Sequence, residues 1–134
     1  MSSRSCVCRI VATERNENMK VMIVEDNAQV RKMIRSFIGD VVTEFVECGD
    51  GSEALKLYAE HQPDLVLMDV KMKEVDGFAA TRAIKTAFPD AHVVIVSPWD
   101  SHRLRRQAAL AGAEKYISKT DLLPLRDVLA HLRK

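Results

Sequence analysis

Five polar side chains suited to phosphate chemistry follow short apolar runs in this chain. Val21–Val24 leads into Glu25 and Asp26, Leu65–Met68 into Asp69, Val93–Val96 into Ser97, and Tyr116–Ser118 into Lys119. Carboxylate oxygens are the ligands that Mg²⁺ prefers, a hydroxyl can donate to a phosphate oxygen, and an ammonium group offsets phosphoryl charge. These residue types therefore suit a divalent cation together with a phosphoryl group.

The apolar runs determine where these side chains lie. Short runs of this kind are typical of buried strands in a parallel sheet. In open α/β sheets the working site lies beyond the carboxyl ends of the strands. We therefore expect three carboxylates, one hydroxyl and one ammonium to converge at one edge of the sheet.

Each polar position also has a simpler interpretation. Glu25 and Asp26 could mark only a helix start, where acidic side chains are favoured. Two carboxylates about 4 Å apart, however, repel by roughly 4 kcal/mol at an effective dielectric near 20, a cost that a bound cation removes. Ser97 could cap a strand end, and Lys119 could form a structural ion pair with Asp69. A carboxylate after four apolar residues is costly unless it is used or paired, so Asp69 is the candidate nucleophile, because aspartates form acyl phosphates in other proteins.

Strands and helices alternate five times along the predicted chain. We expect strands over Lys20–Val24, Val42–Val46, Leu65–Met68, His92–Val96 and Lys115–Ser118. We expect helices after an Asn27 cap, over Ser52–His61, Phe78–Ala87 and Ser101–Ala111, and after an Asp121 cap. Their inward apolar residues are Val30, Met33, Ile34, Phe37 and Ile38, then Ala54, Leu55 and Tyr58, then Leu125, Val128, Leu129 and Leu132. Right-handed crossovers then predict an α/β fold, a doubly wound five-stranded parallel sheet with five helices in three α/β/α layers.

The composition favours a single domain in a reducing compartment. The chain has 134 residues, 47% of them hydrophobic, with a net charge of +1, and this balance predicts neither nucleic-acid binding nor a membrane partner. Three cysteines fit no disulfide framework, so we expect a cytoplasmic protein. Because the chain stops with the fifth helix, we expect no separate output domain.

The first 18 residues lack the periodicity of the rest. We expect residues 1–18 to be a flexible N-terminal extension or a misplaced start, with Met19 as the natural beginning, and residues 19–134 to form the folded domain. Cys6 and Cys8 could instead bind a metal or sense redox state, although no further Cys or His lies nearby.

An ordered set of motifs over residues 19–134 resembles the response regulator receiver domains of the CheY-like superfamily. The motif residues are Val24–Asn27, Leu67–Met72, Val75–Gly77, Val96–Ser97, Gly112–Ala113 and Tyr116–Lys119. The resemblance implies the flavodoxin-like (βα)5 fold. It also implies that the protein is a phosphorylation-controlled signalling module of a two-component system. Such a module catalyses its own phosphorylation from a phosphodonor and is not a turnover enzyme.

The resemblance implies a phosphoacceptor and a metal site. Asp69 would accept a phosphoryl group from a histidine kinase or a histidine phosphotransfer protein. Asp26, Asp69 and the main-chain carbonyl of Lys71 would bind Mg²⁺ or Mn²⁺, and Glu25 would act through water.

The resemblance further implies a switch and a partner surface. Ser97 would turn toward the phosphoryl group, Lys119 would pair with it, and Tyr116 matches the aromatic switch position. A downstream protein would bind the face made by the fourth helix, the fifth strand and the fifth helix. On or near the fourth helix, Arg103, Arg105 and Arg106 could contact an acidic partner or a second copy in a homodimer, or could form only a solvated helix face.

Two departures from the family pattern keep alternatives open. Lys73 stands where proline is usual, and Pro98 follows Ser97 where a small residue is common, which removes a backbone N–H that helps hold a phosphoryl oxygen. We expect Trp99 to lie close to the site, where it could screen attacking water. Lys73 and Pro98 motivate a phosphorylation-independent, receiver-like interaction domain. An aspartyl-phosphate phosphohydrolase is disfavoured, because such enzymes usually have a second acid at the position of Lys71. Flavodoxin-type cofactor binding is also disfavoured, because it needs a phosphate-cradling loop at the position of Glu25 and Asp26.

Overall fold

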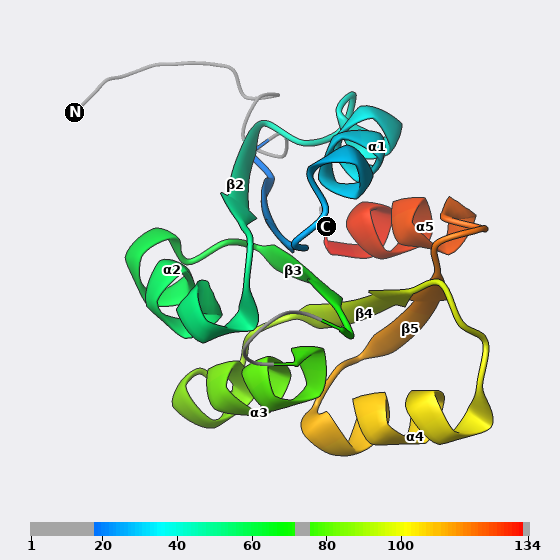
Figure 1. The fold of residues 1–134 in the computed structure, drawn as a ribbon. Coiled ribbons are helices and arrows are strands. Elements are labelled where there is room, and N and C mark those ends of the chain that lie inside the picture. Colours follow the sequence, from blue (N-terminus) through cyan, green and yellow to red (C-terminus); the bar gives the residue numbers. More distant parts are fainter. Residues whose placement is uncertain (1–17, 72–75, 133–134) are drawn as a thin grey trace.

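Five parallel strands form one sheet with helices on both faces. The computed structural model describes residues 18–71 and 76–132. The strands are β1 (Lys20–Val24), β2 (Glu44–Cys48), β3 (Leu65–Asp69), β4 (Val93–Ser97) and β5 (Lys115–Ser118), in the order β2-β1-β3-β4-β5. Helices α1 (Ala28–Ile38) and α5 (Leu123–Leu132) cover one face, and α2 (Ala54–His61), α3 (Gly77–Ala87) and α4 (His102–Ala111) cover the other (Figure 1). The predicted three-layer α/β/α fold is confirmed.

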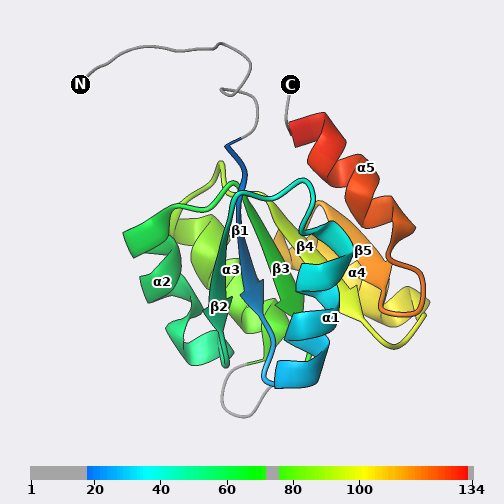
Figure 2. The same cartoon turned by 90° about the horizontal axis from the view of Figure 1, so that it is seen from above.

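Alternation along each strand divides the core in two. Val21 and Ile23 of β1 pack on the α1–α5 side, whereas Met22 and Val24 pack on the α2–α4 side. Both sets are fully buried because helices cover both faces of the sheet, as is usual for parallel strands. Figure 2 shows β1 and β3 in the middle of the sheet, which is where the acidic residues emerge.

The helices begin and end at the capping residues that their sequence supplies. The Asn27 Oδ1 accepts from the N–H groups of Gln29 and Val30 at 2.9 and 3.2 Å, as expected. Gly112 ends α4 with φ of 106°, a left-handed conformation that favours glycine. The longest helices among the described residues have 11 residues, and none there has the length and apolar character needed to cross a membrane.

Strand two and its helix differ from the expected boundaries. β2 begins at Glu44 instead of Val42, because the N–H groups of Thr43 and Glu44 both donate to the Met19 carbonyl and so delay the ladder. A 3-10 turn at Gly51–Glu53 precedes α2, which therefore starts at Ala54 and not at Ser52.

Two residues predicted to lie inward are exposed. Leu55 is 37% exposed, and Leu57 packs against the core in its place, because the buried face of α2 contains Ala54, Leu57 and Tyr58, which lie three and four residues apart. Met33 is 43% exposed, since the apolar stripe of α1 is centred on Ile34 and Ile38. β2 also extends two residues beyond its expected end, to Cys48. The remaining differences are shifts of one residue, with Asp69 and Ser97 included in β3 and β4.

Candidate functional site

The acidic residues meet at the carboxyl ends of β1 and β3. Val24 pairs with Met68 in the parallel register, so Glu25 and Asp26 emerge beside Asp69, the last residue of β3. One carboxylate oxygen of each lies within 4.8 Å of the others. Glu25 and Asp69 are buried, with 3% and 6% of their surface exposed, whereas Asp26 is exposed. The structure thus brings together the three carboxylates that the sequence placed at the ends of two strands.

Lys119 reaches this acidic group from the loop after β5. Its Nζ donates to Glu25 Oε1 at 2.8 Å and to Asp69 Oδ1 at 3.0 Å. The pair with Asp69 was one of the two expectations for Lys119, but the pair with Glu25 was not predicted. Because β4 lies between β3 and β5, the lysine spans the neighbouring strand to reach both acids.

Burial and charge oppose one another at these groups. Burial raises the pKa values of Glu25 and Asp69 above their usual values, although the hydrogen bonds from Lys119 act in the opposite direction. Burial alone would lower the pKa of Lys119, but its hydrogen bonds to Glu25 and Asp69 raise it overall. The single Lys119 ammonium therefore does not neutralise all the negative charge of the carboxylates, and a bound cation would neutralise the remainder.

The donor set fits a hard divalent cation. Three carboxylates and one ammonium carry a net charge of −2 when all are ionised. Glu25 Oε1 accepts from Lys119 and Glu25 Oε2 accepts from the Asn27 N–H at 3.2 Å, so both of its oxygens already have protein donors. The Asp26 carboxylate has no ion pair with the residues that the structure describes, which leaves its oxygens open to a ligand.

Gly77 lets α3 begin directly against Asp69. A Cβ at this position would lie 1.9 Å from the main-chain oxygen of Asp69, so only glycine fits without a shift of backbone. The Gly77 N–H donates to the Val70 carbonyl at 2.7 Å, and Asp76 caps the helix through the Ala79 N–H at 2.8 Å. The Asp76-Gly77 pair therefore supports the strand end that carries Asp69.

Ser97 and Tyr116 are linked through the main chain of Trp99. Ser97 is fully buried beside Asp69, because Asp69 pairs with Val96 between β3 and β4. Its Oγ accepts from the Trp99 N–H at 3.1 Å, which is the first N–H after Ser97 since Pro98 has none. The Tyr116 hydroxyl donates to the Trp99 carbonyl at 2.7 Å, and the Arg105 guanidinium lies 4.9 Å from the centre of the Tyr116 ring.

Sequence reasoning missed Arg31, which holds the loop that carries the acids. Its Nη1 donates to the Glu25 carbonyl at 2.5 Å, and its Nε pairs with Glu47 of β2 at 2.9 Å. A signal was available, because Arg31 lies four residues after the Asn27 cap and so projects from the same side of α1. The role of this arginine is to orient the main chain between β1 and α1.

Some expectations fall outside what the structure describes. Lys73, together with the motif residues Met72 and Val75, lies outside the described residues, as do Cys6 and Cys8. The main-chain carbonyl of Lys71 as a metal ligand stays a prediction.

Comparison with known proteins points to one family. A family model described as response regulator receiver domain matches residues 21–129. The polar-differentiation response regulator DivK of Brucella anthropi is 36% identical over 110 residues, which cover 78% of this chain and 86% of DivK. The uncharacterized transcriptional regulatory protein YhcZ of Bacillus subtilis is 36% identical over 100 residues, 73% of this chain, and the chain spans only 47% of that longer protein.

Solved structures agree with the sequence relatives. The receiver domain of the histidine kinase CKI1 from Arabidopsis thaliana, solved in complex with Mg²⁺ and BeF3⁻, superposes with a TM-score of 0.74 at 28% identity. The match covers 89% of this chain and 92% of the CKI1 chain.

Proposed function

The chain belongs to the family of response regulator receiver domains, and from the geometry of its site we propose that Asp69 is the residue that receives the phosphoryl group. Receiver domains are phosphorylation-controlled signalling modules of two-component systems and not classical enzymes. The phosphorylation-independent alternative is not favoured. We further propose that the functional unit is residues 19–134, with residues 1–18 as an extension.

The contact that best supports this proposal is the double ion pair of Lys119 with Asp69 and Glu25. In the transfer, an Asp69 carboxylate oxygen forms a bond to phosphorus while the bond between phosphorus and the donor nitrogen or oxygen breaks. The phosphoryl oxygens then bring negative charge to a place that already holds the Lys119 ammonium, 3.0 Å from the Asp69 oxygen. An ammonium positioned in advance stabilises that charge without reorganisation.

Asp26 and Asp69, with the main-chain carbonyl of Lys71, would hold Mg²⁺ or Mn²⁺. The ion, when bound, supplies charge neutralisation for the carboxylates and for the transferred phosphoryl group. Glu25 would act through water, because Lys119 and Asn27 already engage its two oxygens. The CKI1 receiver domain, which resembles this chain, was solved with Mg²⁺ and BeF3⁻.

The signal would pass from the phosphorylation site to the protein surface through Ser97, Trp99 and Tyr116. If the Ser97 hydroxyl turns to donate to a phosphoryl oxygen, it gives up the Trp99 N–H, and the same Trp99 residue holds the Tyr116 hydroxyl through its carbonyl. We therefore propose that phosphorylation alters the face made by α4, β5 and α5, where a downstream protein or a second copy of the chain binds. The phosphodonor would be a histidine kinase or histidine phosphotransfer protein, and the cysteine usage favours a cytoplasmic setting.

Labelling with a small phosphodonor tests the assignment. With Mg²⁺ and acetyl phosphate, intact-protein mass spectrometry should show one added phosphoryl group in the native protein and none in Asp69→Asn. The matched control is Asp90→Asn, an exposed aspartate outside the site, which should label like the native protein. Normal labelling of Asp69→Asn would overturn the assignment.

The tryptophan offers a separate test of the metal site. Trp99 is the single tryptophan of the chain, so a Mg²⁺ titration followed by its fluorescence should report binding, and Asp26→Asn should weaken the response. A flat signal in the native protein at saturating Mg²⁺ would argue against a metal site beside Trp99.

A further inference from the structure

The arginines that the structure describes fall into two groups. Four of them pair with carboxylates: Arg31 and Arg35 with Glu47, Arg105 with Asp100, and Arg126 with Asp40. The other three, Arg82, Arg103 and Arg106, are exposed and form no ion pair with a described residue. All three lie on α3 or α4, so the guanidinium groups without a carboxylate partner are gathered on two neighbouring helices.

Neither of these two helices contains an acidic residue. α3 has Arg82 and Lys85, whereas α4 has three arginines. The helices lie side by side (Figure 1), and a Cβ on Gly112, which ends α4, would lie 2.9 Å from the Lys85 Cγ. The pair of helices therefore forms a continuous surface with an excess of positive charge, although the whole chain carries a net charge of only +1.

A hollow between α3 and α4, which we call the α3–α4 groove, opens onto this surface. Its volume is about 300 Å³, and it is lined by Asp76, Phe78, Arg82, Gln107 and Leu110. Leu110 is 77% exposed, more than any other large hydrophobic side chain in residues 18–71 and 76–132. The Asp76 carboxylate is already engaged as the N-cap of α3. The groove thus combines unpaired cations with an apolar side chain that is left exposed to solvent.

The structure separates the three arginines of α4. Arg103, Gln107 and Leu110 share one side of the helix, because positions i, i+4 and i+7 recur on the same face. Arg105 lies on the other side, where its guanidinium is 4.9 Å from the centre of the Tyr116 ring of β5. The α3–α4 groove is therefore separate from the face made by α4, β5 and α5.

Going beyond the phosphorylation of Asp69, we propose that the α3–α4 groove is a docking site for an acidic amphipathic helix of a partner protein. Arg82 lies on one side of the groove, and Arg103 and Arg106 belong to the helix that forms the other side. An occupant that matches this arrangement has an apolar stripe, which packs against Leu110, flanked on both edges by Asp or Glu. The groove and the phosphoryl site consist of different residues, so docking does not require a phosphorylated Asp69.

Two other occupants match the groove less well. A second copy of the chain, related by a two-fold axis, would bring the same arginines face to face, because neither helix has a carboxylate to pair with them. A nucleic acid would pair its phosphates with the arginines, but its backbone would offer no apolar side chain to cover Leu110. An acidic amphipathic helix satisfies both the charge and the apolar surface.

Titration with a synthetic peptide tests the proposal on the full, unphosphorylated chain. The probe is a helix of about 18 residues, or about five turns, with leucine along one stripe and glutamate on both edges of that stripe. The anisotropy of a fluorescein label on the peptide measures the affinity, and the amide shifts of the ¹⁵N-labelled protein locate the contact. The comparison ligands are a peptide of the same composition with its leucines dispersed around the helix, and a DNA duplex.

Matched variants separate the groove from surface charge in general. Arg82→Gln and Arg103→Gln each remove one unpaired cation, and Lys56→Gln removes an exposed cation from α2 as their control. Leu110→Gln removes the exposed apolar side chain of the groove, and Leu55→Gln makes the same change at an exposed leucine of α2.

We expect saturable binding of the probe, with amide shifts centred on α3 and α4. Each arginine variant should weaken binding about twofold to fivefold, because an exposed ion pair contributes little. Leu110→Gln should weaken it about tenfold or more, because the burial of a leucine supplies more of the affinity. Both α2 controls should bind like the native protein, the dispersed peptide should bind more weakly, and added salt should weaken binding because it screens the arginines.

The absence of saturable binding up to about 1 mM peptide overturns the docking site. An equal loss of affinity in Leu110→Gln and Leu55→Gln overturns it too, as do amide shifts centred on β5 and α5. Binding of the DNA duplex without binding of the peptide overturns it in favour of a nucleic acid, and self-association that excludes the peptide overturns it in favour of a second copy. Labelling of Asp69 plays no part in this test, so failure here leaves the proposed function intact.

Discussion

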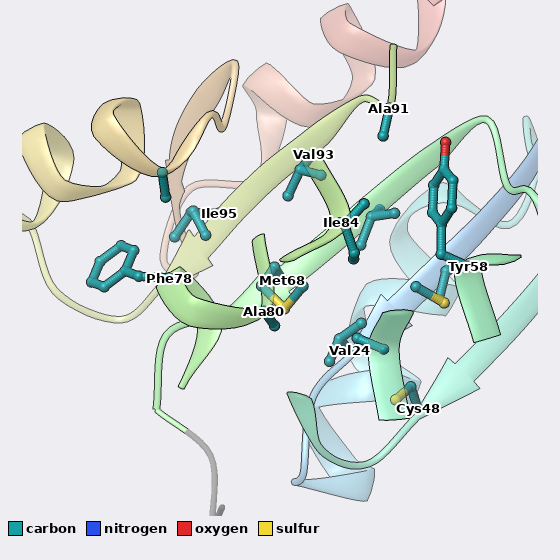
Figure 3. Close-up of a cluster of buried hydrophobic side chains, with 14 of the residues drawn as sticks. Val24, Cys48, Tyr58, Met68, Phe78, Ala80, Ile84, Ala91, Val93 and Ile95 are labelled. Carbon is teal, nitrogen blue, oxygen red and sulfur yellow. The ribbon is translucent and has the colours of Figure 1, made fainter. Parts of the chain in front are cut away.

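The two faces of the sheet are packed with different kinds of side chain. On the α1–α5 face the fully buried members of the cluster are branched aliphatic residues and one methionine, and its aromatic rings, Phe37 and Phe45, are only partly buried. On the α2–α4 face the cluster contains five alanines, two methionines and three aromatic rings together with valine and isoleucine. Figure 3 shows part of it, with Met68 of β3 grouped with Ala80 and Ile84 of α3.

The difference indicates which face can rearrange. Side chains branched at Cβ have few rotamers and interlock, whereas methionine is flexible and alanine leaves space for its neighbours to move. Tyr116 belongs to the α2–α4 cluster. On the other face, Arg126 of α5 bonds both carboxylate oxygens of Asp40 and the Phe37 carbonyl, which ties α5 to the end of α1. We infer that the α1–α5 face holds the sheet while the α2–α4 face accommodates change at the site.

The largest expected effect comes from matched isoleucine deletions, one on each face. Ile34 of α1 and Ile84 of α3 are both buried, with 2% and 0% of their surface exposed. Replacing either by alanine should lower the free energy of unfolding by about 2–5 kcal/mol. Ile34→Ala should lie nearer the upper end, because the cluster that contains Ile84 has two flexible methionines that can fill part of the cavity. Urea denaturation measures both, and equal or reversed costs would break the comparison.

A glycine substitution tests how far the α2–α4 face adapts beside the site. Gly77→Ala places a Cβ 1.9 Å from the Asp69 carbonyl oxygen, so the start of α3 must move. We expect a loss of about 1–3 kcal/mol in the free energy of unfolding and slower phosphoryl labelling. Gly49→Ala is the control, since its nearest non-neighbouring atom would be 4.0 Å away. Native stability and labelling in Gly77→Ala would contradict the role assigned to this close approach.

The substitution Tyr116→Phe tests the difference between the two faces of the sheet with a smaller expected change in free energy. The change removes the hydroxyl that donates to the Trp99 carbonyl at 2.7 Å, and one such hydrogen bond contributes about 0.5–1.5 kcal/mol. We expect faster amide hydrogen exchange in the segment between β4 and α4, with the exchange of α5 unchanged. Comparable acceleration in α1 and α5 would show that the two faces do not respond separately.

The smallest effect concerns acid stability on the α1–α5 face. The hydrogen bonds from Arg126 hold the pKa of the Asp40 carboxyl below its usual value of 3.8. Its contribution to stability is therefore complete above that value and is lost as the pH falls through the lower pKa of the folded state. In Arg126→Met this loss should be absent, so the difference in melting temperature between the native protein and the variant should narrow below about pH 4.

Melting curves from about pH 6 to about pH 3 measure this narrowing. Arg82→Met, which removes an exposed arginine from α3, is the control and should track the native protein at every pH. A difference between Arg126→Met and the native protein that stays constant with pH would show that Asp40 does not contribute through its charge.

Local patterns in the sequence were enough for the strands and most helix ends. β1 and β5 have the predicted boundaries, and Asn27 caps α1, because a short apolar run and an N-cap side chain act over a few neighbouring residues. One error arose from a distant group, because the Met19 carbonyl delays β2. Another arose locally, where a 3-10 turn at Gly51–Glu53 takes the place of the first residues expected in α2.

The amino-acid sequence alone determined the order of the elements, the parallel sheet and the edge at which Glu25, Asp26, Asp69, Ser97 and Lys119 emerge, since strand periodicity and crossover handedness are local or general properties. Only the tertiary structure decided how these residues pair. That Lys119 shares its ammonium between Glu25 and Asp69, and that Lys71 lies over Trp99, depends on side-chain reach between strands that are far apart in the chain.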